Sequence, residues 1–83
     1  MNRSHVLFHL REAEEELSRT IREIEANETY GFGEFVVAIQ HLYHHVNTAW
    51  NGKDATEQQA TNPTDAEFAR WNEFPRDLTM MEA

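Results

Sequence analysis

The chain has 83 residues, the size of one small domain with a limited hydrophobic core. Fifteen Asp and Glu against seven Lys and Arg give a formal net charge of -8, which disfavours nucleic acid and anionic membrane surfaces as partners. The absence of cysteine excludes disulfides, thiolate zinc sites and a cysteine nucleophile. The only apolar run near the start, Val6 to Phe8, is too short for a signal peptide or a membrane span. We therefore expect a cytoplasmic protein.

Apolar residues recur in alternating steps of four and three along the first part of the chain. This spacing predicts one long amphipathic helix over about residues 4–27, with Ser4 as the N-cap residue. The stripe consists of Val6, Leu10, Ala13, Leu17, Thr20 and Ile24. The helix should end near Asn27, because Asn and two Gly follow in quick succession in "NETYGFG" and favour turns and positive φ.

A second amphipathic helix is predicted over about residues 34–50 by the same three and four spacing. Its stripe consists of Phe35, Ile39, Leu42, Val46 and Ala49. Asn51 and Gly52 supply the expected C-terminal stop. Two such helices joined by a short turn form an antiparallel hairpin, so residues 1–52 are expected to be a helical hairpin.

The remainder of the chain divides into a polar linker, residues 53–63, and a short helix with a tail, residues 64–83. Thr64 and Glu67 have the spacing of a capping box, and Pro75 should stop the helix that they begin. Three aromatic residues recur at steps of three along this helix: Phe68, Trp71 and Phe74. Such a stripe packs on its own domain, on a partner subunit or in the groove of another protein.

These elements predict an all-α fold that is completed by a second copy of the chain. A lone hairpin cannot enclose a core, because each helix buries only one stripe and the stripes here are wide. Two hairpins can instead form a four-helix bundle, so we expect a homodimer. The residues expected at interfaces are Tyr43, Trp50, Phe68, Trp71 and Phe74.

Three of the five histidines fall within the stretch "HLYHH", residues 41–45. His41 and His45 are one helical turn apart, a spacing at which both imidazoles can reach one ion. Leu42 occupies the place where a zincin motif needs Glu, so a zinc peptidase of that type is excluded. His44 points away from this pair and is expected to be solvated.

The expected hairpin register, with the turn near Tyr30, places His45 beside Glu16. It leaves His5 and His9 roughly 9 to 15 Å further along the hairpin, too far to join the same site. A simple pairing of His45 with Glu16 would raise the pKa of that histidine above its unfolded value. The alternative is a metal site made by His41, His45 and Glu16.

Two functions from different classes follow from these observations. The leading one is a small acidic interaction or structural module. We expect it not to be an enzyme and to have no resident cofactor, and its negative charge favours a basic protein as a further partner. The alternative is a metal-binding helical bundle that holds a divalent transition metal through His41, His45 and Glu16, with open positions that could support catalysis.

Overall fold

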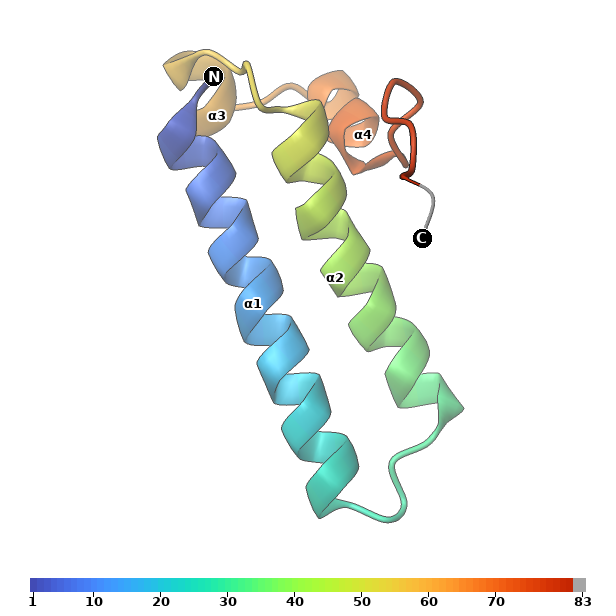
Figure 1. Cartoon of the computed structure of the whole chain (residues 1–83). Helices are drawn as coiled ribbons and strands as arrows, with labels where there is room; N and C mark the ends of the chain where they lie inside the picture. The colour runs from blue at the N-terminus through green and yellow to red at the C-terminus, as the bar shows by residue number, and fades with distance from the viewer. Residues whose placement is uncertain (82–83) are drawn as a thin grey trace.

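The computed structural model describes residues 1–81 and is all-helical within that range, as the sequence predicts. Two long helices, α1 (Arg3–Ala26) and α2 (Phe32–Asn51), run side by side in opposite directions (Figure 1). Two short helices follow, α3 (Glu57–Thr61) and α4 (Asp65–Asn72). The expected segment 64–83 includes two residues, 82–83, that lie outside the described range.

The hairpin is confirmed, but its caps differ from those expected. Asn2, not Ser4, caps α1, and its side-chain oxygen accepts a hydrogen bond from the backbone N–H of His5. The turn also forms without a residue at positive φ anywhere in the described chain. Instead, the side chain of Asn27 accepts hydrogen bonds from the backbone and hydroxyl of Thr29, at 3.0 and 2.7 Å. A side chain that mimics a backbone turn removes the need for a left-handed residue.

The segment predicted to be a polar linker, residues 53–63, contains the short helix α3. Thr56 and Gln59 form a capping box at the start of α3. The predicted box of Thr64 and Glu67 is confirmed at the start of α4. In it, the backbone N–H of Thr64 donates to the Glu67 carboxylate at 2.9 Å, and this hydrogen bond lowers the pKa of Glu67.

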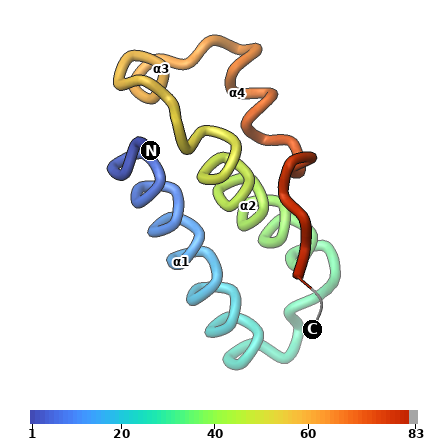
Figure 2. Tube along the Cα trace, turned by 45° about the horizontal axis from the view of Figure 1, so that its top comes forward, coloured from blue at the N-terminus to red at the C-terminus, as the bar shows by residue number. Residues whose placement is uncertain are grey.

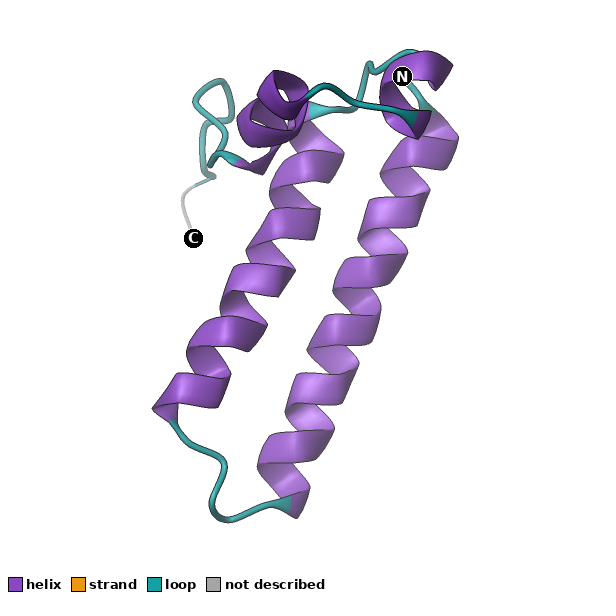
Figure 3. Ribbon diagram, turned by 180° about the vertical axis from the view of Figure 1, so that it is seen from behind, coloured by secondary structure: helices purple, strands orange, loops and turns teal. Residues whose placement is uncertain are grey.

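Helix α4 packs on α2, near the end of α2 that leads into α3 (Figures 1 and 2). Asn47 and Asn51 on α2 donate side-chain hydrogen bonds to backbone carbonyls at the C-terminal end of α4, among them that of Trp71 at 2.9 Å. The chain beyond α4 returns along α2, where Trp50 donates its indole N–H to Asp77 at 2.9 Å. Figure 3 shows the same arrangement from behind, with α3 and α4 together at one end of the hairpin.

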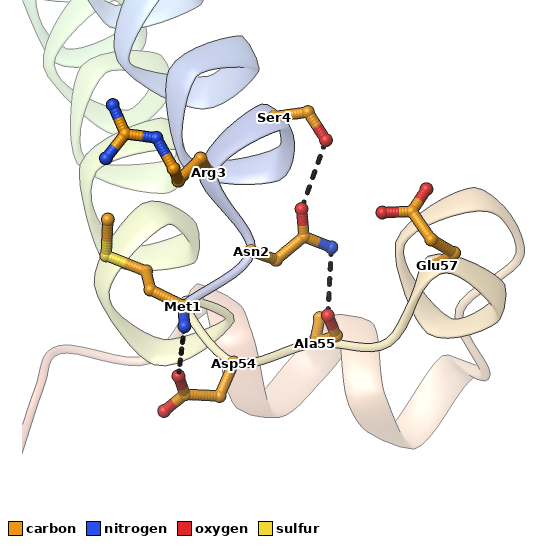
Figure 4. A pocket seen from close by; sticks show the side chains of 7 residues that line it. All are labelled: Met1, Asn2, Arg3, Ser4, Asp54, Ala55 and Glu57. Carbon is orange, nitrogen blue, oxygen red and sulfur yellow. Dashed lines mark hydrogen bonds and ion pairs between the residues drawn. The ribbon is translucent and has the colours of Figure 1, made fainter.

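The start of the chain is tied to the segment that follows α2 (Figure 4). The backbone N–H of Asn2 donates to the carbonyl of Lys53 at 2.6 Å, and its side-chain amide donates to the carbonyl of Ala55 at 2.9 Å. The N-terminal ammonium lies 3.6 Å from Asp54. These contacts close the end of the hairpin opposite its turn.

The core is small and, along α1, largely polar. The buried residues of α1 are His5, Ala13, Glu16 and Thr20, and those of α2 are Asn47, Thr48 and Ala49. Among the described residues, only Ala13, Ala49 and Trp71 are apolar and buried. The expected stripe therefore divides: Ala13 and Thr20 face α2, while Leu17 remains 49% exposed. Small residues at the seam allow close approach of the helices but exclude little apolar surface from water.

None of the helices in the described part of the chain has both the length and the apolar composition needed to cross a bilayer.

Candidate functional site

All five histidines gather in one cluster of neighbouring rings contributed by α1 and α2. Helix α1 contributes His5 and His9, one turn apart, and α2 contributes His41, His44 and His45. The ring centroids of His9 and His45 are 5.3 Å apart, and those of His5 and His9 are 4.8 Å apart. His41 and His44 extend the cluster from His45, at 6.4 and 4.8 Å.

The closest polar contact in the cluster joins the two long helices. The Nδ1 atoms of His9 and His45 lie 3.0 Å apart, so one ring donates an N–H to the lone pair of the other. The expected register was therefore wrong, because it placed His9 well beyond His45. The turn between Ala26 and Phe32 is centred one residue earlier than assumed, which shifts the register by two residues, and the long imidazole side chains span the remaining offset.

Burial and the charges of neighbouring histidines disfavour the protonated forms of His9 and His45. Burial, followed by the charges of the other histidines, lowers the pKa of His9 to about 4. Burial also lowers the pKa of His45, and the charge of His44 acts in the same direction. The expected rise in the His45 pKa is thus wrong: Glu12 and Glu16 do raise it, but burial outweighs them. At neutral pH these imidazoles present lone pairs.

Glu16 lies at the edge of the cluster and is 6% exposed. Its carboxylate accepts a hydrogen bond from Arg19 of the next turn, and His41 Nδ1 lies 3.5 Å away from its other oxygen. Of the residues predicted from the sequence, the structure thus brings His41 to Glu16, while His45 turns to His9. A recess opens beside them, and it is lined by Glu12, Glu15, Glu16, Arg19, His41 and His45.

His44 is only partly exposed, whereas the sequence predicted a fully solvated side chain. Its Nδ1 lies 2.7 Å from the side-chain oxygen of Asn72, and its ring lies 5.3 Å from that of Phe68, so α4 covers it. The prediction was wrong because it considered only the hairpin, whereas α4 packs on the outer side of α2.

His5 connects the cluster to the buried end of α4. Its ring is 7% exposed and lies 5.3 Å from the ring of Trp71. Its Nε2 has no hydrogen-bond partner among the described residues. A Cβ added to Gly52 would lie 2.7 Å from this nitrogen and 3.3 Å from Trp71, so glycine is needed there for close approach and not for positive φ.

Within residues 1–81, no group of three or more His, Asp or Glu side chains is arranged so that it could hold a metal ion. The site that the structure offers instead is a pair of imidazoles, one from each long helix. Two carboxylates, Glu12 and Glu16, lie nearby.

A second candidate site is an exposed apolar face on the hairpin. We define the apolar face by its large side chains that remain between 40% and 49% exposed: Leu7, Leu10, Leu17, Ile21, Ile24, Phe35, Tyr43 and Val46. On an ideal helix of about 100° per residue, these positions are rotated in the same sense from the buried seam on α1 and on α2. Because the helices are antiparallel, both stripes lie on one flank of the hairpin.

The predicted interface residues have different positions relative to this face. Tyr43 belongs to it and is 46% exposed, and Trp50 is half-buried beside the C-terminal segment. Trp71 is only 3% exposed and packs within its own chain. Phe68 and Phe74 flank it with outer surfaces exposed, and Phe74 contacts the Tyr43 ring at 5.2 Å.

Sequence reasoning missed His5, His9 and His44 as members of the cluster. The available signal was the repeated four-residue spacing, His5 with His9 and His41 with His45, which places one histidine pair on each long helix. The register error and the reach of the imidazole side chains, which the prediction did not consider, together account for the miss.

Compared with known proteins, the chain matches no family model, no curated protein and no solved structure.

Proposed function

We propose that the chain is a small acidic interaction module that works as a homodimer, in which the apolar faces of two hairpins pack together into a four-helix bundle. The observation that carries this proposal is the exposure of the apolar face, whose leucines, isoleucines and aromatic residues remain between 40% and 49% exposed. Contiguous exposed apolar surface on a small protein marks an interaction site.

The solvent-accessible area supports the same proposal. A folded monomer of this mass is expected to expose roughly 5,100 Å² from the scaling of surface with size. The chain exposes 6602 Å², about 1,500 Å² more than that scaling predicts. Standard interfaces take about 800 Å² from each partner, and obligate dimers take more. The excess therefore has the size of one side of a dimer interface.

A second copy is the favoured occupant because of the shape and spacing of the face. Leu10, Leu17 and Ile24 recur every seven residues on α1, which is the repeat that packs helices side by side in bundles. A face made of two antiparallel helices can pack on itself about a two-fold axis. The acidic outer surface of such a dimer would remain available for a basic protein partner.

The test compares two substitutions of an exposed apolar residue by Glu. Leu17→Glu places a charge at the centre of the apolar face, whereas Val37→Glu places one at a 58% exposed position on the opposite flank. Light scattering should give about twice the 9.7 kDa chain mass for the wild type and for Val37→Glu. Leu17→Glu should give the chain mass or lose cooperative unfolding, since the core of the single chain is small.

The melting temperature gives an independent readout. For a dimer that unfolds to separate chains, it should rise with protein concentration in the wild type. A wild-type chain that remains monomeric at 100 μM and melts at a temperature independent of concentration would contradict the proposal.

A further inference from the structure

The pair formed by His9 and His45 has a geometry that an interaction module does not require. Each long helix contributes one imidazole, and the two Nδ1 atoms meet at 3.0 Å. Two ligands at right angles on a metal, with metal–nitrogen bonds of about 2.0 to 2.1 Å, lie about 2.9 Å apart. The observed spacing thus suits adjacent positions on a square-planar or octahedral ion.

The surroundings of the pair favour a cation. Helix α1 brings Glu12 and Glu16 to the same side of the hairpin, where they line one recess together with His41 and His45. His45 borders this recess, and His9 borders a second one, lined also by Ser4, His5 and Phe8, so solvent reaches both imidazoles without unfolding of the hairpin.

We propose that His9 and His45 supply two nitrogen ligands to a divalent transition metal ion, with water in the remaining positions; the spacing favours square-planar Cu²⁺ over tetrahedral Zn²⁺. The proton that one Nδ1 donates to the other moves to Nε2 of its own ring when the ion binds. Both Nδ1 lone pairs then face the metal, and the rings remain neutral throughout. Imidazole is a preferred ligand of both ions, and Cu²⁺ should bind more tightly than Zn²⁺.

This site differs from the one that the sequence suggested. His41 is directed to Glu16 at 3.5 Å and is 65% exposed at its side chain, so it is not one of the two proposed ligands. The site is also independent of the apolar face, because His9 and His45 lie at the seam within one hairpin. Failure of the dimer proposal and failure of the metal proposal are therefore separate results.

The first experiment titrates the metal-free protein with CuCl₂ and with ZnCl₂ at pH 7.5 by calorimetry, with the quenching of tryptophan fluorescence by Cu²⁺ as a second signal. We expect one ion per chain, removable by EDTA. His9→Gln and His45→Gln should each weaken binding at least tenfold. His41→Gln, a matched change one turn from His45, should alter it by less than threefold. Circular dichroism of each variant checks that the hairpin persists.

A second experiment needs no variant and remains informative if a substitution unfolds the chain. Long-range ¹H–¹⁵N spectra of the labelled wild type report each histidine ring, and Zn²⁺ should shift the Nδ1 resonances of two rings. Equal binding by the wild type and His9→Gln would overturn the proposal and indicate an adventitious ion only. Shifts confined to Nε2 atoms, or to a single ring, would overturn it as well.

Discussion

At the scale of single residues, the environment of His9 in the fold differs most from what its neighbours in the sequence suggest. Nothing in "LFHLRE" marks it as other than a surface histidine on a charged helix. The fold half-buries it among three other histidines, and burial together with their charges lowers its pKa to about 4. A residue that would be half-protonated near pH 6.5 in an unfolded chain thus stays neutral in the folded one.

This shift predicts acid destabilisation. The folded pKa of His9 lies below the unfolded value of about 6.5, so acid protonates His9 in the unfolded chain first. His9 therefore does not lower the free energy of unfolding above about pH 6.5, but lowers it increasingly as pH falls toward 4. His5 and His45, with lowered pKa values, act in the same direction. We expect the wild type to lose on the order of 1 to 2 kcal/mol more than His9→Gln between pH 7 and 4.5, since partial exposure screens the charge.

Urea unfolding at fixed protein concentration in EDTA, at several pH values, measures this difference. The comparison with His9→Gln removes the contribution of carboxylates that titrate in the same range. Equal pH dependence in the two proteins would show that His9 is solvated. A wild type that gains stability relative to His9→Gln on acidification would show the opposite shift, as pairing with a carboxylate would produce.

At the scale of elements, the helices were predictable because their signals are local. Heptad spacing located α1 and α2, and the Thr64 capping box located the start of α4 to the residue. The packing was not predictable to the same degree. The seven-residue repeat says which positions are apolar, but it does not say whether Ala13 or Leu17 faces the neighbouring helix. The histidine cluster depends on which residues of α1 and α2 lie level with each other, and the position of the turn sets this register. An error of one residue in the centre of the turn changes every pairing between the two helices.

The docking of α4 gives an element-scale prediction. Trp71 is 3% exposed and is held between α2 and His5, whereas Phe74 on the same aromatic stripe is 67% exposed. Trp71→Ala should therefore lower the free energy of unfolding by about 3 to 5 kcal/mol, as the loss of a buried large aromatic does. Phe74→Ala should cost less than about 1 kcal/mol. Chemical denaturation of both variants at one protein concentration tests this, and equal costs would mean that α4 does not pack through Trp71.

At the scale of the whole molecule, the net charge and the apolar face have opposite effects on the pairing of two chains. Each chain carries -8, so pairing two chains brings like charges together while it removes apolar surface from water. A dimer of this kind is held by burial and weakened by repulsion. The acidic surface should also limit association beyond the dimer, since strong net charge opposes it.

An increase in ionic strength should then strengthen the proposed dimer. Salt screens the repulsion between the two acidic chains, with a Debye length that falls from about 14 Å at 0.05 M to about 4 Å at 0.5 M, and it leaves apolar burial intact. We expect the dissociation constant to fall several-fold over this range of NaCl. Sedimentation equilibrium measures it directly, with Leu17→Glu as the variant that should remain unassociated throughout. A dimer that weakens as salt is added would instead be held by ion pairs across its interface, and the apolar face would not be what joins the two chains.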